Sequence, residues 1–280
     1  MSDANSMNRR TTLVTGSRSG MGQAVADLLN RRGELTMGVD VADAEIVADL
    51  STAAGRMQAV EAVISLCPDG IDAIIACAGV VASDGPTVIS TNYFGVIELI
   101  EGLHSLLARG NAPRAVVVAS SVNMLASDPL LVTACLDHQE ERARQLADGN
   151  ALAYASSKLA LTRWVRRTSI LPGWADTGIL LNGVAPGLVR TAMTAPSFAT
   201  EEGRTMLSQV APHATLQAAE PEDIAPLLAF LASADNAYMV GQVPYCDGGK
   251  DILLRGDDVI TTAPASTYSR ARMSAPNGSV

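Results

Sequence analysis

The chain has 280 residues, of which 48% are hydrophobic and 18% charged, and its formal net charge is −9. Nucleic acids and anionic lipid surfaces attract basic proteins, so this acidic balance argues against both, and we expect neither a nucleic-acid nor a membrane partner. The longest apolar run, 73–82, is far shorter than a membrane-spanning helix. Four cysteines and three histidines are scattered along the chain, so no disulfide framework and no metal site are indicated, and a reducing cytoplasmic location fits best.

Short runs rich in valine and isoleucine alternate with longer segments of helical spacing. This pattern is typical of βαβ units and predicts an α/β fold, a doubly wound, Rossmann-type parallel sheet in a single domain. The predicted strands, in chain order, are 11–15, 35–39, 45–48, 71–76, 115–119, 179–185 and 243–246. The predicted helices are 21–32, 52–67, 96–107, 136–147, 151–171 and 221–231.

The chain is slightly longer than one dinucleotide-binding domain of about 230 to 250 residues. The additional residues are assigned to the two ends of the chain and to one internal insertion. We expect residues 1–8 to be a flexible N-terminus, 9–255 the NAD(P)-binding catalytic domain, and 256–280 a C-terminal tail. Residues 127–150 break the strand and helix rhythm and are interpreted as an insertion. Residues 192–219 are interpreted as a substrate lid.

A glycine-rich turn, 15–22, lies between the first strand and the first helix. Glycines there let backbone N–H groups approach a pyrophosphate, which also meets the positive end of the helix. The spacing G-x-x-x-G-x-G departs from the G-x-G-x-x-G fingerprint, so a simple strand-to-helix corner is the alternative. Asp40 ends the second strand, where a carboxylate would accept both hydroxyls of an adenine ribose and repel a 2′-phosphate. This favours NAD over NADP, although Arg18 could pair with a phosphate.

Tyr154 and Lys158 are one helical turn apart in the predicted helix 151–171 and share a face. An ammonium close to a phenol favours the phenolate and would lower the tyrosine pKa from its usual value of about 10. Tyr154 would then be a general acid or base. Such pairs also occur by chance on solvated helices, so the context decides. Ser120 and Ser121 follow the fifth strand at the edge where parallel sheets bind ligands, and Asn92 opens the preceding predicted helix.

With these motifs in order along one chain, the sequence resembles the short-chain dehydrogenase/reductase family from about residue 11 to residue 251. The matching elements are TGSRSGMG (15–22), ACAG (76–79), NYFG (92–95), ASS (119–121), YASSK (154–158), PGLVRT (186–191) and DGG (247–249). The segments 40–50 and 152–162 and the insertion resemble most the bacterial 3α-hydroxysteroid dehydrogenase/carbonyl reductase branch.

The resemblance implies four catalytic residues. Tyr154 would exchange a proton with the substrate oxygen, and Lys158 would lower its pKa and bind the nicotinamide ribose. Ser121 would donate a hydrogen bond to that oxygen; it is preferred to Ser120 because it directly precedes the loop. Asn92 would hold a relay water. The resemblance also implies an NAD site made of Gly16, Ser19, Met21, Gly22, Asp40, Asp49, Leu50, Ala78, Gly79, Tyr154, Lys158, Pro186, Gly187, Val189 and Thr191.

Two features depart from the family pattern. Cys77 stands where the family usually has asparagine, and we expect it to be buried filler rather than a nucleophile. The insertion separates Ser121 from Tyr154 by far more than the usual dozen residues. Because the family's common tetramer packs helices near this region, we expect a homo-oligomer, with a dimer preferred to a tetramer.

The resulting hypothesis is an oxidoreductase that moves a hydride between NAD(H) and a secondary alcohol or ketone, a steroid or another cyclic apolar substrate. The alternatives are a dehydrogenase of a dihydrodiol or sugar and a non-catalytic NAD-responsive binding protein. Side chains able to line the substrate cavity, or to pack beneath the lid, are Met124, Leu125, Met193, Phe198, Met206 and Leu207.

Overall fold

A computed structural model describes residues 9–81 and 84–259, so the expected flexible N-terminus and most of the expected C-terminal tail lie outside the described residues. Its seven strands are parallel and form one sheet in the order β3-β2-β1-β4-β5-β6-β7. They are β1 (Thr11–Thr15), β2 (Leu35–Asp40), β3 (Ile46–Val47), β4 (Ala73–Ala76), β5 (Arg114–Val118), β6 (Leu180–Pro186) and β7 (Tyr245–Cys246). The predicted fold class is confirmed.

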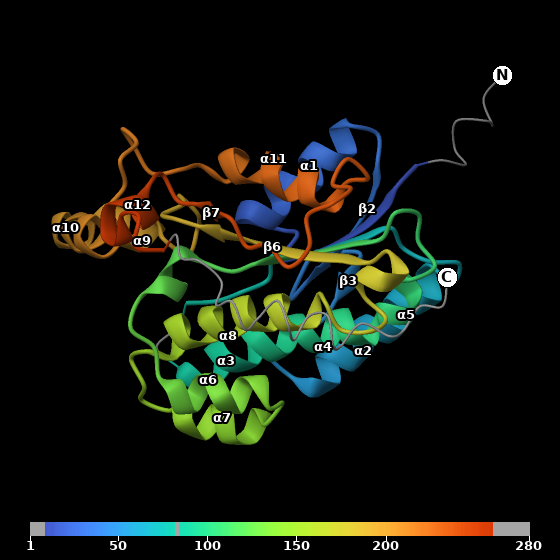
Figure 1. Ribbon diagram of the computed structural model, residues 1–280, viewed down its shortest axis with the longest axis horizontal. Helices are drawn as coiled ribbons and strands as arrows, with labels where there is room; N and C mark the ends of the chain where they lie inside the picture. The colour runs from blue at the N-terminus through green and yellow to red at the C-terminus, as the bar shows by residue number, and fades with distance from the viewer. Residues whose placement is uncertain (1–8, 82–83, 260–280) are drawn as a thin grey trace, which may run out of the picture.

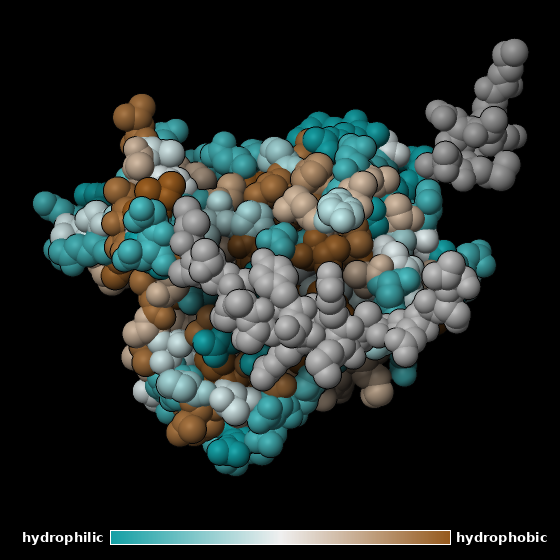
Figure 2. Space-filling view, in the orientation of Figure 1, coloured by the Kyte–Doolittle hydropathy of each residue, from teal (hydrophilic) through white to brown (hydrophobic). Residues whose placement is uncertain are grey.

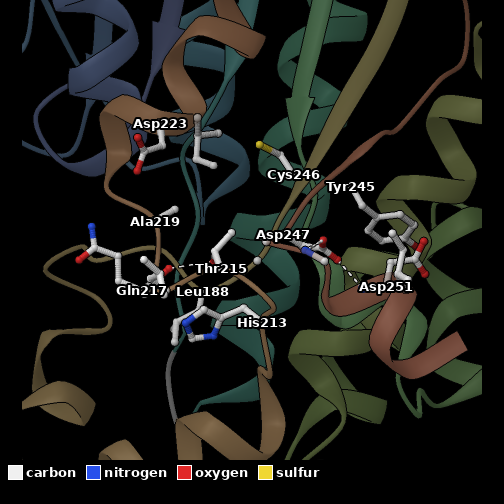
Figure 3. Close-up of a pocket in the computed structure, with 17 residues that line it drawn as sticks. Leu188, His213, Thr215, Gln217, Ala219, Asp223, Tyr245, Cys246, Asp247 and Asp251 are labelled. Atoms are coloured by element: carbon white, nitrogen blue, oxygen red, sulfur yellow. Dashed lines mark hydrogen bonds between the residues drawn. The ribbon is translucent and has the colours of Figure 1, made fainter. Parts of the chain in front are cut away.

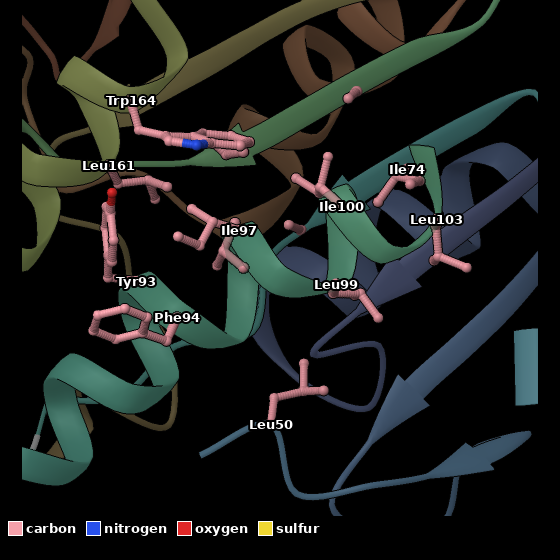
Figure 4. Close-up of a cluster of buried hydrophobic side chains, with 14 of the residues drawn as sticks. Leu50, Ile74, Tyr93, Phe94, Ile97, Leu99, Ile100, Leu103, Leu161 and Trp164 are labelled. Atoms are coloured by element: carbon pink, nitrogen blue, oxygen red, sulfur yellow. The ribbon is translucent and has the colours of Figure 1, made fainter. Parts of the chain in front are cut away.

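Helices cover both faces of the sheet (Figure 1). On one face lie α1 (Gly20–Arg31) and α11 (Pro221–Ala232); on the other lie α2 (Ala53–Leu66), α4 (Gly95–Gly102) and α8 (Ala153–Thr168). Neighbouring residues of a strand alternate between the two layers, so Leu13 packs with the α4 and α8 side and Val14 with the α1 and α11 side. Figure 4 shows the larger layer, where Ile97 and Ile100 of α4 face Leu161 and Trp164 of α8.

The helical run that leads into α4 begins earlier than the sequence predicts. It starts with α3 (Gly85–Ile89), passes through a π-helical turn, η1 (Ser90–Phe94), and continues as α4, and the short α5 (His104–Leu107) follows. Asn92 therefore does not open a helix, as expected, but lies in the middle of this run. A π turn inserts one residue into the helical repeat, which redirects the side chains that it carries.

The inserted segment folds as two helices rather than as the single predicted helix 136–147. They are α6 (Pro129–Leu136) and α7 (Glu140–Ala147), and they pack below α3 and α8 in Figure 1. Asp128 caps α6, because its carboxylate accepts hydrogen bonds from the N–H groups of Leu130 and Leu131. His138, with φ of 56°, turns the chain between the two helices.

The expected lid region contains two helices, α9 (Ala195–Ala199) and α10 (Glu201–Val210), which gather with α12 (Lys250–Arg255) at one end of the molecule (Figure 1). Figure 2 shows hydrophobic side chains at this end, and Ile252 and Leu253 of α12 are among its exposed apolar residues. Such a surface is compatible with the expected homo-oligomer, which stays a prediction. None of the helices within 9–81 and 84–259 combines the length and the apolar character needed to cross a bilayer.

Candidate active site

Two adjoining cavities lie at the carboxyl ends of the central strands. The larger, of about 400 Å³, follows β1, β2 and β4 and is lined by Gly16, Asp40 and Leu50 among others. The smaller, of about 90 Å³, contains Ser120, Tyr154 and Lys158. Both cavities are lined by Met21, Cys77, Gly79, Val80, Thr191 and Met193. Most of the predicted binding residues therefore meet the predicted catalytic residues Tyr154 and Lys158 in one elongated site, whereas Asn92 and Ser121 are not among the residues that line it.

The glycine-rich turn forms one end of the larger cavity. Gly16 has φ of 66°, and a Cβ atom there would lie 2.9 Å from the backbone nitrogen of Ala78. A Cβ atom on Gly22 would lie 2.1 Å from the carbonyl oxygen of Gly16. Ser19 precedes α1 without capping it by its side chain, so the N–H groups of the first turn remain for an anion. The turn thus has the close packing and the donors that a pyrophosphate needs.

Asp40 lines the same cavity, and its carboxylate is oriented by backbone N–H groups. Oδ2 accepts a hydrogen bond of 3.0 Å from the N–H of Arg18, and Oδ1 accepts one of 2.7 Å from Val41. Arg18 thus contributes its backbone N–H to Asp40. Asp49 and Leu50, the expected adenine contacts, line the same cavity.

Asn92 fixes the wall between the two cavities. Its Oδ1 accepts a hydrogen bond of 2.7 Å from the N–H of Val80, and its Nδ2 donates one of 2.8 Å to the carbonyl of Val80. A Cβ atom on the neighbouring Gly79 would lie 3.1 Å from Asn92 Oδ1 and 3.6 Å from Lys158 Nζ. The structure thus brings Asn92 and Lys158 together around Gly79, and the small size of that glycine lets them approach.

Lys158 is buried in the middle of α8 and points its amine at the sheet. Nζ donates a hydrogen bond of 2.8 Å to the carbonyl of Val118, the last residue of β5. Burial lowers the pKa of Lys158 to about 8, and the neighbouring Cys77 opposes this shift. Desolvation also raises the pKa of Cys77 to about 12, so this thiol is protonated at neutral pH, but Cys77 is only partly buried and lines both cavities, so it belongs to the wall of the site and is not buried filler as expected.

Tyr154 lies one turn before Lys158, and the lysine Nζ is 5.9 Å from the centre of its ring. Burial raises the pKa of Tyr154 above its usual value, and a hydrogen bond with Ser120 opposes the shift. The expected lowering by Lys158 is therefore not found. Desolvation of the phenol is the main cause of the shift, and the Lys158 ammonium, which is held by the Val118 carbonyl, does not contribute to it.

Ser120, not Ser121, is the hydroxyl beside Tyr154. Ser120 lines the small cavity, whereas Ser121 begins the short helix η2 (Ser121–Met124) and is only 2% exposed. The backbone at Ser120 is still extended, with φ of −170°, so its side chain points to the same side as that of Val118, which also lines the cavity. The preference for Ser121 is thus not supported by the geometry, which places the Ser120 hydroxyl beside Tyr154.

Asn123 is a polar residue near the site that the sequence does not single out. It accepts a hydrogen bond of 2.9 Å from the Tyr245 hydroxyl and donates one of 2.9 Å to Thr162 Oγ1, which in turn donates to the Lys158 carbonyl at 2.8 Å. This chain fastens η2 to α8 and β7. Its only signal in the sequence is a polar side chain shortly after the two serines.

The segment after β6 closes the small cavity. Pro186, Gly187, Val189 and Thr191 line it, as expected. Gly187 also lines a separate cavity of about 740 Å³, shown in Figure 3, which lies between this segment, the start of α11 and the β7–α12 connection. A Cβ atom on Gly187 would lie 2.6 Å from the Cα atom of Asp247, so the DGG motif packs directly against the wall of the site.

The lid contributes less than the sequence predicts. Of the six apolar residues expected near the substrate, Met193 lines both site cavities, but the residues lining those cavities do not include the other five. Phe198 stacks on the guanidinium of Arg190 at 4.3 Å, and Leu207 is a buried residue of α10, within the lid itself. Met206 and Leu125 are exposed.

Burial of Lys158 has a measurable effect on stability. Its pKa is about 8 in the fold, against an ordinary value of 10.5, so between these values the unfolded chain binds more protons and stability rises with pH. At pH 7 the fold bears the full cost of the buried ammonium. Lys158→Met removes this cost but also loses the hydrogen bond to Val118, so we expect a net rise in the free energy of unfolding of about 1–2 kcal/mol at pH 7. At pH 10 the buried amine of the wild type is already neutral, so the stabilisation by the substitution should be smaller.

Urea denaturation at the two pH values measures this difference. Arg163→Met, on the exposed side of the same helix, is the matched control and should show no such pH dependence. An equal change for Lys158→Met at both pH values would contradict the assignment of a perturbed lysine.

Comparison with known proteins agrees with this geometry. A family model described as NAD dependent epimerase/dehydratase matches residues 12–179, and one described as enoyl-(acyl carrier protein) reductase matches residues 139–251. The chain is 35% identical to the 3-alpha-hydroxysteroid dehydrogenase/carbonyl reductase of Comamonas testosteroni, over 87% of this chain and 97% of the relative.

Solved structures of dehydrogenases are also similar to this chain. The 3-alpha-hydroxysteroid dehydrogenase from Pseudomonas sp. B-0831, complexed with NADH, superimposes with a TM-score of 0.82 at 38% identity, covering 88% of this chain and 98% of that one. The aldohexose dehydrogenase of Thermoplasma acidophilum, with a TM-score of 0.70, 17% identity and coverage of 92% and 98%, shares the fold. The chain therefore belongs to the short-chain dehydrogenase/reductase family and is an oxidoreductase of that family.

Proposed function

We propose that the protein transfers a hydride between NAD(H) and a secondary alcohol or ketone, with a steroid or another cyclic apolar compound as substrate. The observation that carries the proposal is the placement of Ser120, Tyr154 and Lys158 at one end of an elongated cavity whose other end has a glycine turn and Asp40. The names of the two relatives, a 3-alpha-hydroxysteroid dehydrogenase/carbonyl reductase and a dehydrogenase complexed with NADH, support the substrate class and the cofactor.

The residues of the larger cavity fit a dinucleotide. Gly16 and Gly22 pack so closely against backbone atoms that no Cβ atom fits at either position, which keeps the turn tight, and Ser19 leaves the N–H groups of α1 free of a side-chain cap. Asp40 presents a carboxylate at the end of β2, where it would bind the hydroxyls of the adenine ribose and repel a 2′-phosphate on that ribose. When bound, the nicotinamide gives or takes the hydride. Its side of the site would be formed by Ala78, Gly79, Pro186, Gly187, Val189 and Thr191.

In the direction of ketone reduction, Tyr154 donates its proton to the substrate oxygen, and in the reverse direction it takes the proton back. Ser120 donates a second hydrogen bond to the same oxygen and so stabilises the negative charge that develops there. Lys158, with a pKa of about 8, can supply a proton near neutral pH. Asn92 binds the backbone of Val80, which lines the cavity together with Lys158. In the proposed mechanism Asn92 also holds a water that relays protons between Lys158 and solvent.

The alternatives are less well supported. A sugar would need several polar partners, whereas Val118, Val189 and Met193 give apolar walls around Tyr154. A non-catalytic NAD-responsive protein would not need the serine, tyrosine and lysine together. We therefore retain the cyclic apolar substrate.

The first test is Tyr154→Phe, assayed with NADH and a panel of cyclic ketones by absorbance of the reduced cofactor. Without the phenolic proton we expect kcat/KM to fall by at least about 100-fold. NADH affinity, followed by fluorescence, should change little, because the ring remains. Full turnover by the variant would refute the catalytic assignment.

Ser120→Ala and Ser121→Ala form a matched pair that separates two neighbouring hydroxyls. Loss of a hydrogen-bond donor to a developing oxyanion costs about 100-fold in kcat, so we expect Ser120→Ala to lose roughly that factor. Ser121→Ala should stay within a few-fold of wild type. The reverse ranking in steady-state assays would restore the role to Ser121.

Asp40 should decide between the two nicotinamide cofactors. We expect kcat/KM with NAD to exceed that with NADP by at least about 100-fold, since a 2′-phosphate would face an unneutralised carboxylate. Asp40→Ser removes the repulsion and should shrink this ratio, mainly through the KM for NADP. A preference of the wild-type enzyme for NADP would overturn the assignment.

A further inference from the structure

Arg56 of α2 is a buried guanidinium that joins three other segments of the chain. Its side chain is 2% exposed. Nε donates a hydrogen bond of 2.6 Å to Glu98 of α4, and Nη1 donates one of 3.3 Å to the carbonyl of Leu50. Nη1 and Nη2 donate to the two carboxylate oxygens of Glu140, at 3.3 and 2.5 Å. A charge that is removed from water needs such partners.

Glu140 is the partner that the inserted segment supplies. It begins α7, and its side chain is only 24% exposed, compared with 40% for Glu98. Two donors of Arg56 bind Glu140 in a forked arrangement, which fixes direction as well as distance. The insertion therefore provides the more buried of the two carboxylates that compensate Arg56.

Glu140 also contacts the π turn that carries Asn92. Ser90 Oγ donates a hydrogen bond of 2.7 Å to Glu140 Oε1 and accepts one of 2.7 Å from Arg144 Nη1. Ser90 is fully buried and is the first residue of η1, two residues before Asn92. Glu140 and Arg144 of the insertion thus both bind the Ser90 hydroxyl, which fixes the first residue of the π turn.

Close backbone contacts make this arrangement stiff. A Cβ atom on Gly85, at the start of α3, would lie 2.0 Å from the carbonyl oxygen of Ala147 at the end of α7. A Cβ atom on Gly95, at the start of α4, would lie 2.8 Å from the carbonyl oxygen of Leu50. Leu50 is therefore held between Arg56 and α4, and α7 lies directly on the helical run that contains Asn92.

We infer that Glu140 is a positioning residue of the dinucleotide and catalytic site, through which the inserted helices hold Leu50 by way of Arg56 and Asn92 by way of Ser90. Leu50 lines the larger cavity, and Asn92 fixes Val80 at the junction of the two. The inference rests on the proposed function, because its readouts are cofactor binding and turnover. Glu140 touches neither cavity and acts only through these two contacts.

The test compares Glu140→Gln with Glu141→Gln. Both variants remove one negative charge by a nearly isosteric change, at neighbouring positions of one helix. Glu141, however, is exposed, and within residues 9–81 and 84–259 its carboxylate accepts a hydrogen bond from Gln145 alone. Glutamine cannot accept both donors of Arg56, so we expect the Kd for NADH to rise about five- to tenfold in Glu140→Gln. Glu141→Gln should bind NADH as wild type does.

Ser90→Ala separates the two contacts, since it removes the link to the π turn and leaves Arg56 paired with Glu140. We expect it to lower kcat about three- to tenfold while the Kd for NADH stays within twofold of wild type. A merely structural role would lower the melting temperature in both variants without this split between binding and turnover.

The outcomes distinguish this inference from the proposed function. If wild-type protein does not bind NADH, the proposed function fails. If wild-type protein binds NADH and Glu140→Gln binds it equally well in the folded state, the positioning role is refuted. Equal Kd and kcat changes in the Glu140 and Glu141 variants would refute it as well, because the charge alone would then be responsible.

Discussion

The hydrogen bond from Lys158 Nζ to the carbonyl of Val118 fixes the geometry on which the rest of the site depends. It joins the middle of α8 to the last residue of β5, so that Tyr154, one turn back along the helix, meets Ser120, two residues beyond the strand. An amine buried this deeply keeps one strong acceptor and loses its water, which is why its own pKa falls. Orientation and acidity at the site thus have a common physical origin.

The central strands were predictable because parallel sheets buried on both faces favour continuous apolar runs, and β4 and most of β5 have them. The order of the motifs was enough to locate the glycine turn between the first strand and the first helix. It also located Tyr154 and Lys158 on one face of the predicted helix 151–171. The choice between Ser120 and Ser121 was not predictable in this way. It depends on how far the extended backbone continues past β5 before η2 turns it.

Quantities that depend on burial were equally beyond the sequence. Spacing places a lysine near Tyr154, but the direction of the tyrosine pKa shift depends on how much water both groups lose. The same holds for Asn92. Its position in the chain favours the N-terminus of a helix. In the fold the helical run continues through Asn92, and its side-chain amide makes two hydrogen bonds with the backbone of Val80. The π turn makes this possible, and spacing in the sequence does not reveal one.

The pair α6 and α7 lies in the connection between Ser120 and Tyr154, and this has a consequence for how the chain folds. Closing a loop of some thirty residues instead of about a dozen costs only about 1 kcal/mol of chain entropy, so the insertion is thermodynamically cheap. Its effect is on rate. The two halves of the site are more distant along the chain, and contacts of greater sequence separation form later. By the same argument the contact between Ser120 and Tyr154 forms after the local contacts within α6 and α7, but before the pairing of β5 with β6, whose partners Arg114 and Leu180 lie farther apart along the chain.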